Sequence, residues 1–183
     1  MVVGTWYLVL GTWDLVLTTR CYTSVMSTLH IIYASTSGHT EHVVHTLVSF
    51  FKEKAPQVAV EVQRAEQAKP EDLKRGDVLL LASGTWNTGG VEGQANPHME
   101  DFFSRAEGMD LQGKPMAFIA LGDTRYYYTA RAAEHFQQFR LAAKGTQLLP
   151  PLIIVDEPYG QEGKVCTWGE KLVAALAKST VRG

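Results

Sequence analysis

The stretch from Leu29 to Val44 constrains the fold most, because its residue pattern changes twice within a short distance. It opens with an apolar run, Leu29 to Tyr33, which is typical of a strand buried on both faces of a sheet. Small and polar residues follow at positions 35–40, and apolar residues then recur at helical spacing from Val43 to Phe51. A strand, a hydroxyl-rich turn and a helix in this order predict a loop that binds an anion.

The start of such a helix supplies the physical reason. Its first N–H groups have no partner and carry partial positive charge, so a loop that leads into the helix can surround a phosphate with donors. Gly38 allows close approach of the backbone, and hydroxyl groups are added by Ser35, Thr36, Ser37 and Thr40. No Lys or Arg lies between Leu29 and Phe51, which excludes a P-loop. We expect the monophosphate of a larger ligand; the alternative is an ordinary helix N-cap.

Composition limits the remaining possibilities. A chain of 183 residues is most economically one domain with a substantial core. Its 17 basic and 19 acidic side chains are nearly balanced, so we expect no nucleic-acid partner. The two cysteines, Cys21 and Cys166, provide neither a disulfide framework nor metal-ligand spacing. This usage fits a reducing cytoplasm and predicts no metal site.

Residues 1–25 differ from the rest of the chain. The segment 4–10, Gly-Thr-Trp-Tyr-Leu-Val-Leu, is repeated at 11–17 with Asp14 in place of the tyrosine. A short DNA repeat read through successive frames encodes this peptide, so we interpret residues 1–25 as an N-terminal extension that is non-native or poorly ordered. Gly11 and Asp14 interrupt the apolar run, which argues against a secretory signal, and a membrane span needs roughly 20 apolar residues. The domain is expected to cover 26–183.

Apolar runs and helical patterns alternate along the rest of the chain. Further strands are predicted at 57–65, 78–82, 116–121 and 148–155, the last around Pro150-Pro151. A short helical turn is predicted at 70–75, and helices at 98–109, 129–144 and 162–178, the middle one closed by Gly145. Residues 83–90 and 122–128 are predicted as loops. The alternation predicts an α/β fold with a five-stranded parallel sheet covered on both faces.

Ligands of an open parallel sheet bind at the carboxyl ends of its strands. The loops after the first, third and fourth predicted strands are unusual, since one offers hydroxyls and two offer an aromatic residue beside glycines. Trp86 and Tyr126 are placed to flank a flat heterocycle whose phosphate lies in the first loop. The alternatives are that Trp86 packs over a sheet edge and that Tyr126 is a half-exposed loop residue.

These motifs together resemble the flavodoxin family, and the short-chain type most closely. The resemblance is carried by Ser35-Thr36-Ser37-Gly38-His39-Thr40-Glu41, by Thr85-Trp86-Asn87 and by Leu121-Gly122-Asp123 with Tyr126. It extends over about Met26 to Lys178. It implies a flavodoxin-like doubly wound three-layer sandwich with strand order 2-1-3-4-5 and a bound FMN.

The resemblance also implies a set of cofactor-binding residues. The phosphate would be held by Ser35, Thr36, Ser37, Gly38, His39 and Thr40. The polar edge of the flavin would be bound by Ser83, Gly84, Thr85, Trp86, Asn87, Thr88, Gly89, Leu121, Gly122 and Asp123. Trp86 and Tyr126 would sandwich the ring system, with Tyr128 as a rival for the outer position. The sequence departs from the family at His39, where Asn is usual, and in its net charge of only −2.

The implied function is that of a low-potential one-electron carrier with non-covalently bound FMN. Such a protein would be a monomer that shuttles electrons between a flavodoxin reductase and acceptor enzymes, without catalytic residues of its own and without membrane insertion. The alternative is an FMN-dependent NAD(P)H:quinone-type reductase on the same fold, which would need an open nicotinamide pocket. A third hypothesis is a flavin-free signalling or scaffold domain, and the presence of Trp86 and Tyr126 argues against it.

Overall fold

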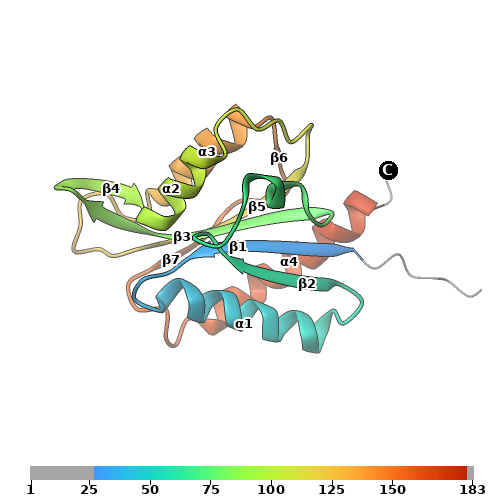
Figure 1. The fold of residues 1–183 in the computed structure, drawn as a ribbon. Coiled ribbons are helices and arrows are strands. Elements are labelled where there is room, and N and C mark those ends of the chain that lie inside the picture. Colours follow the sequence, from blue (N-terminus) through green and yellow to red (C-terminus); the bar gives the residue numbers. More distant parts are fainter. Residues whose placement is uncertain (1–26, 181–183) are drawn as a thin grey trace, which may run out of the picture.

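The computed structural model describes residues 27–180, shown as a ribbon in Figure 1. The elements in chain order are β1 (Thr28–Ala34), α1 (His39–Lys54), β2 (Ala59–Arg64), the 3-10 helix η1 (Pro70–Lys74), β3 (Val78–Thr88), β4 (Val91–Ala95), α2 (Pro97–Arg105), β5 (Pro115–Gly122), α3 (Ala132–Ala142), β6 (Thr146–Gln147), β7 (Leu152–Val155) and α4 (Glu162–Thr180). The interpretation of residues 1–25 concerns a segment outside the described residues.

The strands form one sheet in the order β2-β1-β3-β5-β6, and all these pairings are parallel. β7 pairs with the second half of β5, so β6 and β7 share the fifth position of the sheet. The predicted strand at 148–155 is thus interrupted, because Pro150 and Pro151 lack the N–H groups that a continuous ladder requires. The predicted α/β class and its strand order are confirmed.

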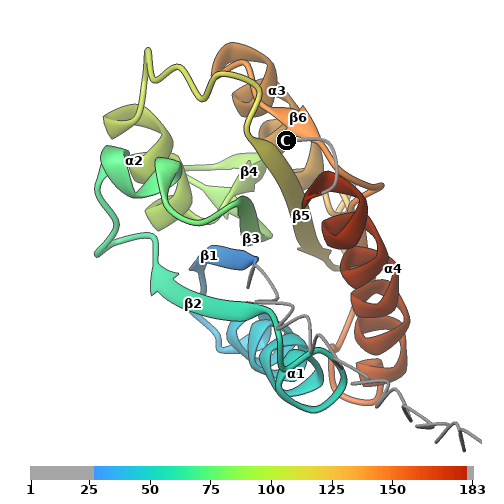
Figure 2. The same ribbon diagram turned by 90° about the vertical axis from the view of Figure 1, so that its right-hand side faces the viewer.

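Alternating side chains of the central strands form two separate cores. Leu80 of β3 and Ile119 of β5 pack beneath α1 and α4. Leu81 and Phe118, on the opposite face, pack beneath α2 and α3. Figure 2 shows the two helix layers on either side of the sheet. This arrangement explains why β1, β3 and β5 are apolar at nearly every position.

Residues 83–90 do not form the predicted loop. β3 continues to Thr88 and pairs in antiparallel fashion with β4, so these residues belong to a hairpin. Gly89 and Gly90 form its turn with φ values of 60° and 81°, the left-handed conformation that tight hairpin turns require. The glycines and Asn87 signal a turn correctly, but the turn is shorter than expected and the strand longer.

The assignment of Gly145 as the left-handed residue that closes α3 is wrong. Lys144 adopts that conformation, with φ of 55°. A Cβ atom at position 145 would lie 2.3 Å from Sδ of Met116, so glycine allows the Met116 side chain of β5 to pack closely against this position. The helix itself is shorter than predicted at both ends. Between residues 27 and 180, no helix has the length and apolar character to cross a membrane.

Candidate functional site

A cavity of about 300 Å³ lies at the carboxyl ends of β1, β3 and β5. Four segments surround it, namely the β1–α1 turn, the β3–β4 hairpin, the β5–α3 segment and the β7–α4 loop, which all lie at one end of the sheet in Figure 1. Of the predicted cofactor-binding residues, those lining the cavity are Thr36, Ser37, His39, Thr40, Gly84, Thr85, Trp86, Asn87, Leu121, Gly122, Asp123, Tyr126 and Tyr128.

In the β1–α1 turn, the Ser35 hydroxyl faces its own backbone. Its oxygen accepts hydrogen bonds from the N–H groups of Gly38 at 3.2 Å and Glu41 at 3.3 Å. The N-cap residue of α1 is Gly38, which makes no side-chain cap bond, so the alternative of an ordinary Ser or Thr N-cap is wrong. Ser35 holds the turn from three residues before the N-cap, and neither it nor Gly38 lines the cavity. Thr36, Ser37, His39 and Thr40 line the cavity, so the turn provides its polar wall.

The β3–β4 hairpin provides the aromatic wall. Trp86 is half-buried and lines the cavity, and a Cβ at Gly84 would lie 3.3 Å from its Nε1, so glycine leaves room for the indole. Ser83 lies behind the cavity, fully buried, where its hydroxyl accepts from Asn96 N and donates to Gly84 O. Thr88 and Gly89 are exposed at the hairpin tip and do not line the cavity.

The β5–α3 segment closes the opposite side. Asp123 pairs with Arg125, whose Nε lies 2.9 Å from both carboxylate oxygens. Hydrogen bonds from the Arg125 side chain and backbone lower the pKa of Asp123 to about 2, so the carboxylate is charged at neutral pH. A Cβ at Gly122 would lie 2.1 Å from the backbone nitrogen of Ala130, which shows how closely this segment packs on the end of β5.

Two tyrosines of this segment reach the cavity. Tyr126 is 49% exposed and Tyr128 40% exposed, and both line it. The N–H of Tyr126 donates to Asp123 O at 3.2 Å. The N–H of Tyr128 donates to Glu92 at 3.1 Å, and the Arg131 guanidinium lies 4.4 Å from the Tyr128 ring centroid. Both remain candidates for a ring that stacks on a ligand.

Several lining residues have no counterpart in the predicted set: Glu92, Gly93, Arg125, Asp156 and Glu157. Asp156 and Glu157 follow directly on the last strand, so the rule that ligands bind at strand carboxyl ends would have found them. Glu92 and Gly93 reach the cavity only because β4 folds back on β3. Gly89-Gly90 is the sequence signal that could have indicated this pairing, since two glycines between extended runs are typical of a hairpin turn.

The mouth of the cavity is acidic. Its charged lining residues are Glu92, Asp123, Asp156 and Glu157 against Arg125. His39 lies between the turn and this rim, with Nε2 3.4 Å from a carboxylate oxygen of Glu157. Over the described part of the chain, no cluster of three or more His, Cys, Asp or Glu side chains is arranged to hold a metal ion.

The two ends of the cavity differ in chemistry. One end presents hydroxyls and the start of a helix, which suit an anion. The other end presents an indole and phenol rings, which suit a flat aromatic group. The geometry therefore fits an elongated ligand with an anionic tail and an aromatic head, and a volume of about 300 Å³ is at the lower end for ligand pockets.

Comparisons with known proteins show which family the chain belongs to. The flavodoxin family pattern matches residues 31–168. A flavodoxin of Maridesulfovibrio salexigens is 27% identical over 149 residues, covering 79% of this chain and 95% of that protein. A flavodoxin of Nitratidesulfovibrio vulgaris is 28% identical over 156 residues, covering 82% of this chain and all of that protein. The crystal structure of oxidised Flavodoxin 2 from Bacillus cereus superposes with a TM-score of 0.71 at 27% identity, covering 83% of this chain and 99% of that one.

Proposed function

Because the chain belongs to the flavodoxin family and is an FMN-binding electron carrier, we propose that the cavity at the ends of β1, β3 and β5 holds the FMN. The proposal rests chiefly on one observation. The polar turn, the indole and the tyrosines come from three separate segments and line the same cavity. Bound FMN supplies the redox chemistry, which is the uptake and release of single electrons at low potential.

At the polar end, Thr36, Ser37, His39 and Thr40 would hold the phosphate, together with N–H groups of the turn. Ser35 and Gly38 contribute indirectly, since the Ser35 hydroxyl fixes the path of the turn. His39 adds an imidazole ring to this wall of the cavity. The phosphate therefore needs no Lys or Arg within the turn.

At the aromatic end, Trp86 and one of the two tyrosines would stack on the faces of the ring system, each contact worth about 0.5 to 1.5 kcal/mol beyond its burial. Main-chain groups of 84–87 and 121–123 would contact its polar edge. These residues bind and orient the cofactor, and they exclude water from its faces.

The acidic rim, formed by Glu92, Asp123, Asp156 and Glu157, would influence the reduction potential of the bound FMN and the choice of redox partner. Carboxylates at the cavity mouth disfavour a gain of negative charge inside it, which favours a low potential. The same charges attract basic surfaces, as expected for docking to a reductase and to acceptor enzymes. We propose that the protein acts between such redox partners as a cytoplasmic monomer, and that residues 26–183 form its FMN-binding domain.

The alternative of an FMN-dependent NAD(P)H:quinone-type reductase is not favoured. The matching relatives are flavodoxins, which are electron-transfer proteins and not enzymes.

The experiment that tests the site uses the purified full-length chain. We expect a yellow protein that releases FMN on denaturation in a ratio of about one per chain. Trp86→Ala should weaken FMN binding by about tenfold, whereas Trp168→Phe, a change of a buried tryptophan of α4 that does not line the cavity, should leave it unchanged. A colourless protein that ignores added FMN would refute the proposal. Rapid oxidation of NADPH by the protein alone would favour the reductase.

A further inference from the structure

We propose that Arg64, the last residue of β2, is the positioning residue of the β1–α1 turn. Its guanidinium also neutralises the carboxylate of Glu41, which would otherwise repel an anion bound at the turn. The inference rests on the proposed function, because it assumes that the turn binds the phosphate of FMN. It concerns a residue outside the turn and outside the cavity lining.

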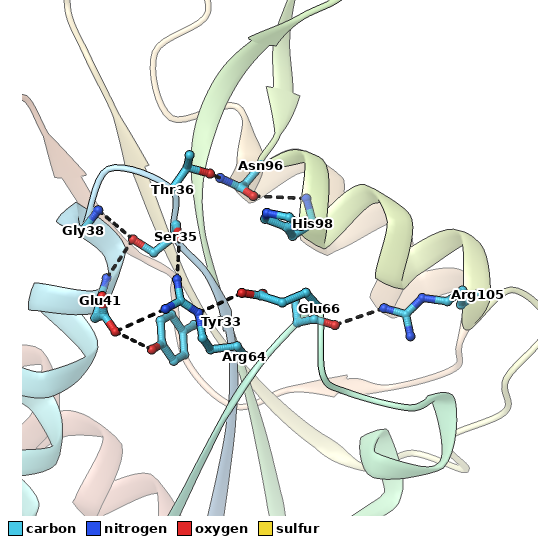
Figure 3. A network of polar contacts seen from close by, with 11 residues as sticks. Tyr33, Ser35, Thr36, Gly38, Glu41, Arg64, Glu66, Asn96, His98 and Arg105 are labelled. Carbon is cyan, nitrogen blue, oxygen red and sulfur yellow. Dashed lines mark hydrogen bonds and ion pairs between the residues drawn. The ribbon is translucent and has the colours of Figure 1, made fainter.

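Arg64 reaches the turn from the neighbouring strand. In the parallel register it stands opposite Tyr33, and its guanidinium lies 5.6 Å from the centroid of that ring. Its Nη2 donates a hydrogen bond of 2.7 Å to the carbonyl oxygen of Ser35 (Figure 3). The contact joins the edge strand β2 to the first residue of the turn.

Ser35 is thereby held at both of its polar groups. Arg64 binds its carbonyl, while its hydroxyl accepts from Gly38 N and Glu41 N. One residue later, the Thr36 hydroxyl accepts a bond of 2.9 Å from Asn96 at the start of α2. Contacts from both sides of β1 therefore fix the turn before any ligand enters, which reduces the entropy lost on binding.

The charge of Arg64 has a second consequence. Glu41 lies in the first turn of α1, the region where an anion would bind, and a free carboxylate there would repel a phosphate. Its Oε1 instead faces Arg64 Nη1 at 3.6 Å and accepts from the Tyr33 hydroxyl at 2.9 Å. Burial and the bond to Glu41 raise the pKa of Tyr33 to about 12, so the phenol stays protonated and remains a donor.

Arg64 also contacts Glu66, with Nε 2.8 Å from its carboxylate. The guanidinium thus lies between two carboxylates and a carbonyl, each of which restricts its orientation. A lysine at this position would retain the charge but would lack the planar fork that reaches several acceptors together.

The test separates an effect on the phosphate from an effect on the fold by using two ligands. Flavin-free full-length protein is titrated with FMN and with riboflavin, which has the same ring system without the phosphate, and flavin fluorescence is recorded. For Arg64→Gln we expect FMN affinity to fall about tenfold and riboflavin affinity to change less than twofold. Adding Glu41→Gln to this variant removes the unpaired carboxylate, so the double variant should bind FMN at least threefold more tightly than Arg64→Gln alone.

Arg75→Gln is the matched control. Arg75 also pairs with a carboxylate of β2, Glu61, at 2.8 Å, but this pair lies away from the turn, so both affinities should stay within twofold of wild type. Should Arg64→Gln fail to fold, Arg64→Lys carries the same test, with an expected loss of about threefold for FMN alone. Equal losses for both flavins, or unchanged FMN affinity, would overturn the role of Arg64. Failure of the wild-type protein to bind either flavin would refute the proposed function instead.

Discussion

Asn96 offers the sharpest test of how the site is built, because one buried side chain serves both the fold and the turn. It is the N-cap of α2, where its Oδ1 accepts from His98 N at 3.1 Å. Its Nδ2 donates to the Thr36 hydroxyl at 2.9 Å, and the residue is fully buried. We therefore expect Asn96→Ala to reduce stability more than Asn96→Asp does, and Asn96→Asp to reduce FMN affinity more than Asn96→Ala does.

The expected magnitudes follow from the two bonds. Losing the N-cap costs about 1 kcal/mol, and losing the bond to Thr36 costs about 1 kcal/mol more. Asn96→Ala should lower the free energy of unfolding by about 2 kcal/mol, or the Tm by roughly 4–8 °C for a chain of this size. Asp is as effective an N-cap residue as Asn, and the Thr36 hydroxyl can rotate so that it donates a hydrogen bond to the Asp carboxylate. Burial of the new carboxylate costs free energy, which charge-assisted hydrogen bonds from His98 N and the Thr36 hydroxyl and the start of α2 offset. Asn96→Asp should therefore stay within about 1 kcal/mol of wild type.

Ligand affinity should show the reverse order. The Asp variant places a negative charge beside the turn that holds the phosphate, so we expect FMN affinity to fall about tenfold, and by less in Asn96→Ala. Urea unfolding of the flavin-free chain and FMN titration measure the two quantities. A double-mutant cycle with Thr36→Ala should give a coupling energy of about 1 kcal/mol. Equal destabilisation by Ala and Asp, or a coupling energy near zero, would refute the reasoning.

Three further predictions follow from single positions. His30 is buried, and burial together with the nearby charge of Arg75 lowers its pKa below 6.5. The unfolded chain therefore binds a proton at a higher pH than the folded chain does, and the free energy of unfolding decreases as the pH falls below about 6.5. His30→Leu should flatten this part of a plot of unfolding free energy against pH, and an unchanged slope would contradict the prediction. Gly122→Ala would place a Cβ 2.1 Å from a backbone nitrogen, so we expect a loss of about 3 kcal/mol in urea unfolding, and a stability equal to wild type would be inconsistent with the packing. Gly93→Ala would place a Cβ 2.8 Å from that of Tyr128, so FMN affinity measured by titration should fall if Tyr128 stacks on the flavin, and unchanged affinity would argue for the other tyrosine.

Patterns that repeat along the chain were enough to predict the architecture. Runs such as Met116 to Leu121 can be buried on both faces only in a parallel sheet between helix layers, so their alternation with helices leads to a three-layer fold. The position of the turn before α1 was also predictable, because small and polar residues separate a buried strand from a helical pattern there. That the turn binds a phosphate stays a prediction. Helix boundaries were less accurate, since the ends of α2 and α3 depend on loop packing.

Contacts between distant segments could not be read from the sequence. Residues 83–90 look like a loop locally, and only pairing with β4 extends β3 and brings Glu92 to the cavity. Whether the Ser35 hydroxyl faces a ligand or its own backbone depends on atoms six residues away, and its carbonyl partner Arg64 lies on another strand.

The amino-acid pattern was sufficient for the central strands, the four main helices and the types of residue at the strand ends, because burial and backbone preference act over a few neighbours. The hairpin strand β4, the split between β6 and β7, and the division of side chains into those that line the cavity and those that hold the turn from behind depend on the folded chain. The reason is that hydrogen bonds and ion pairs are directional and short-ranged, so their partners exist only once the sheet has brought separate segments together.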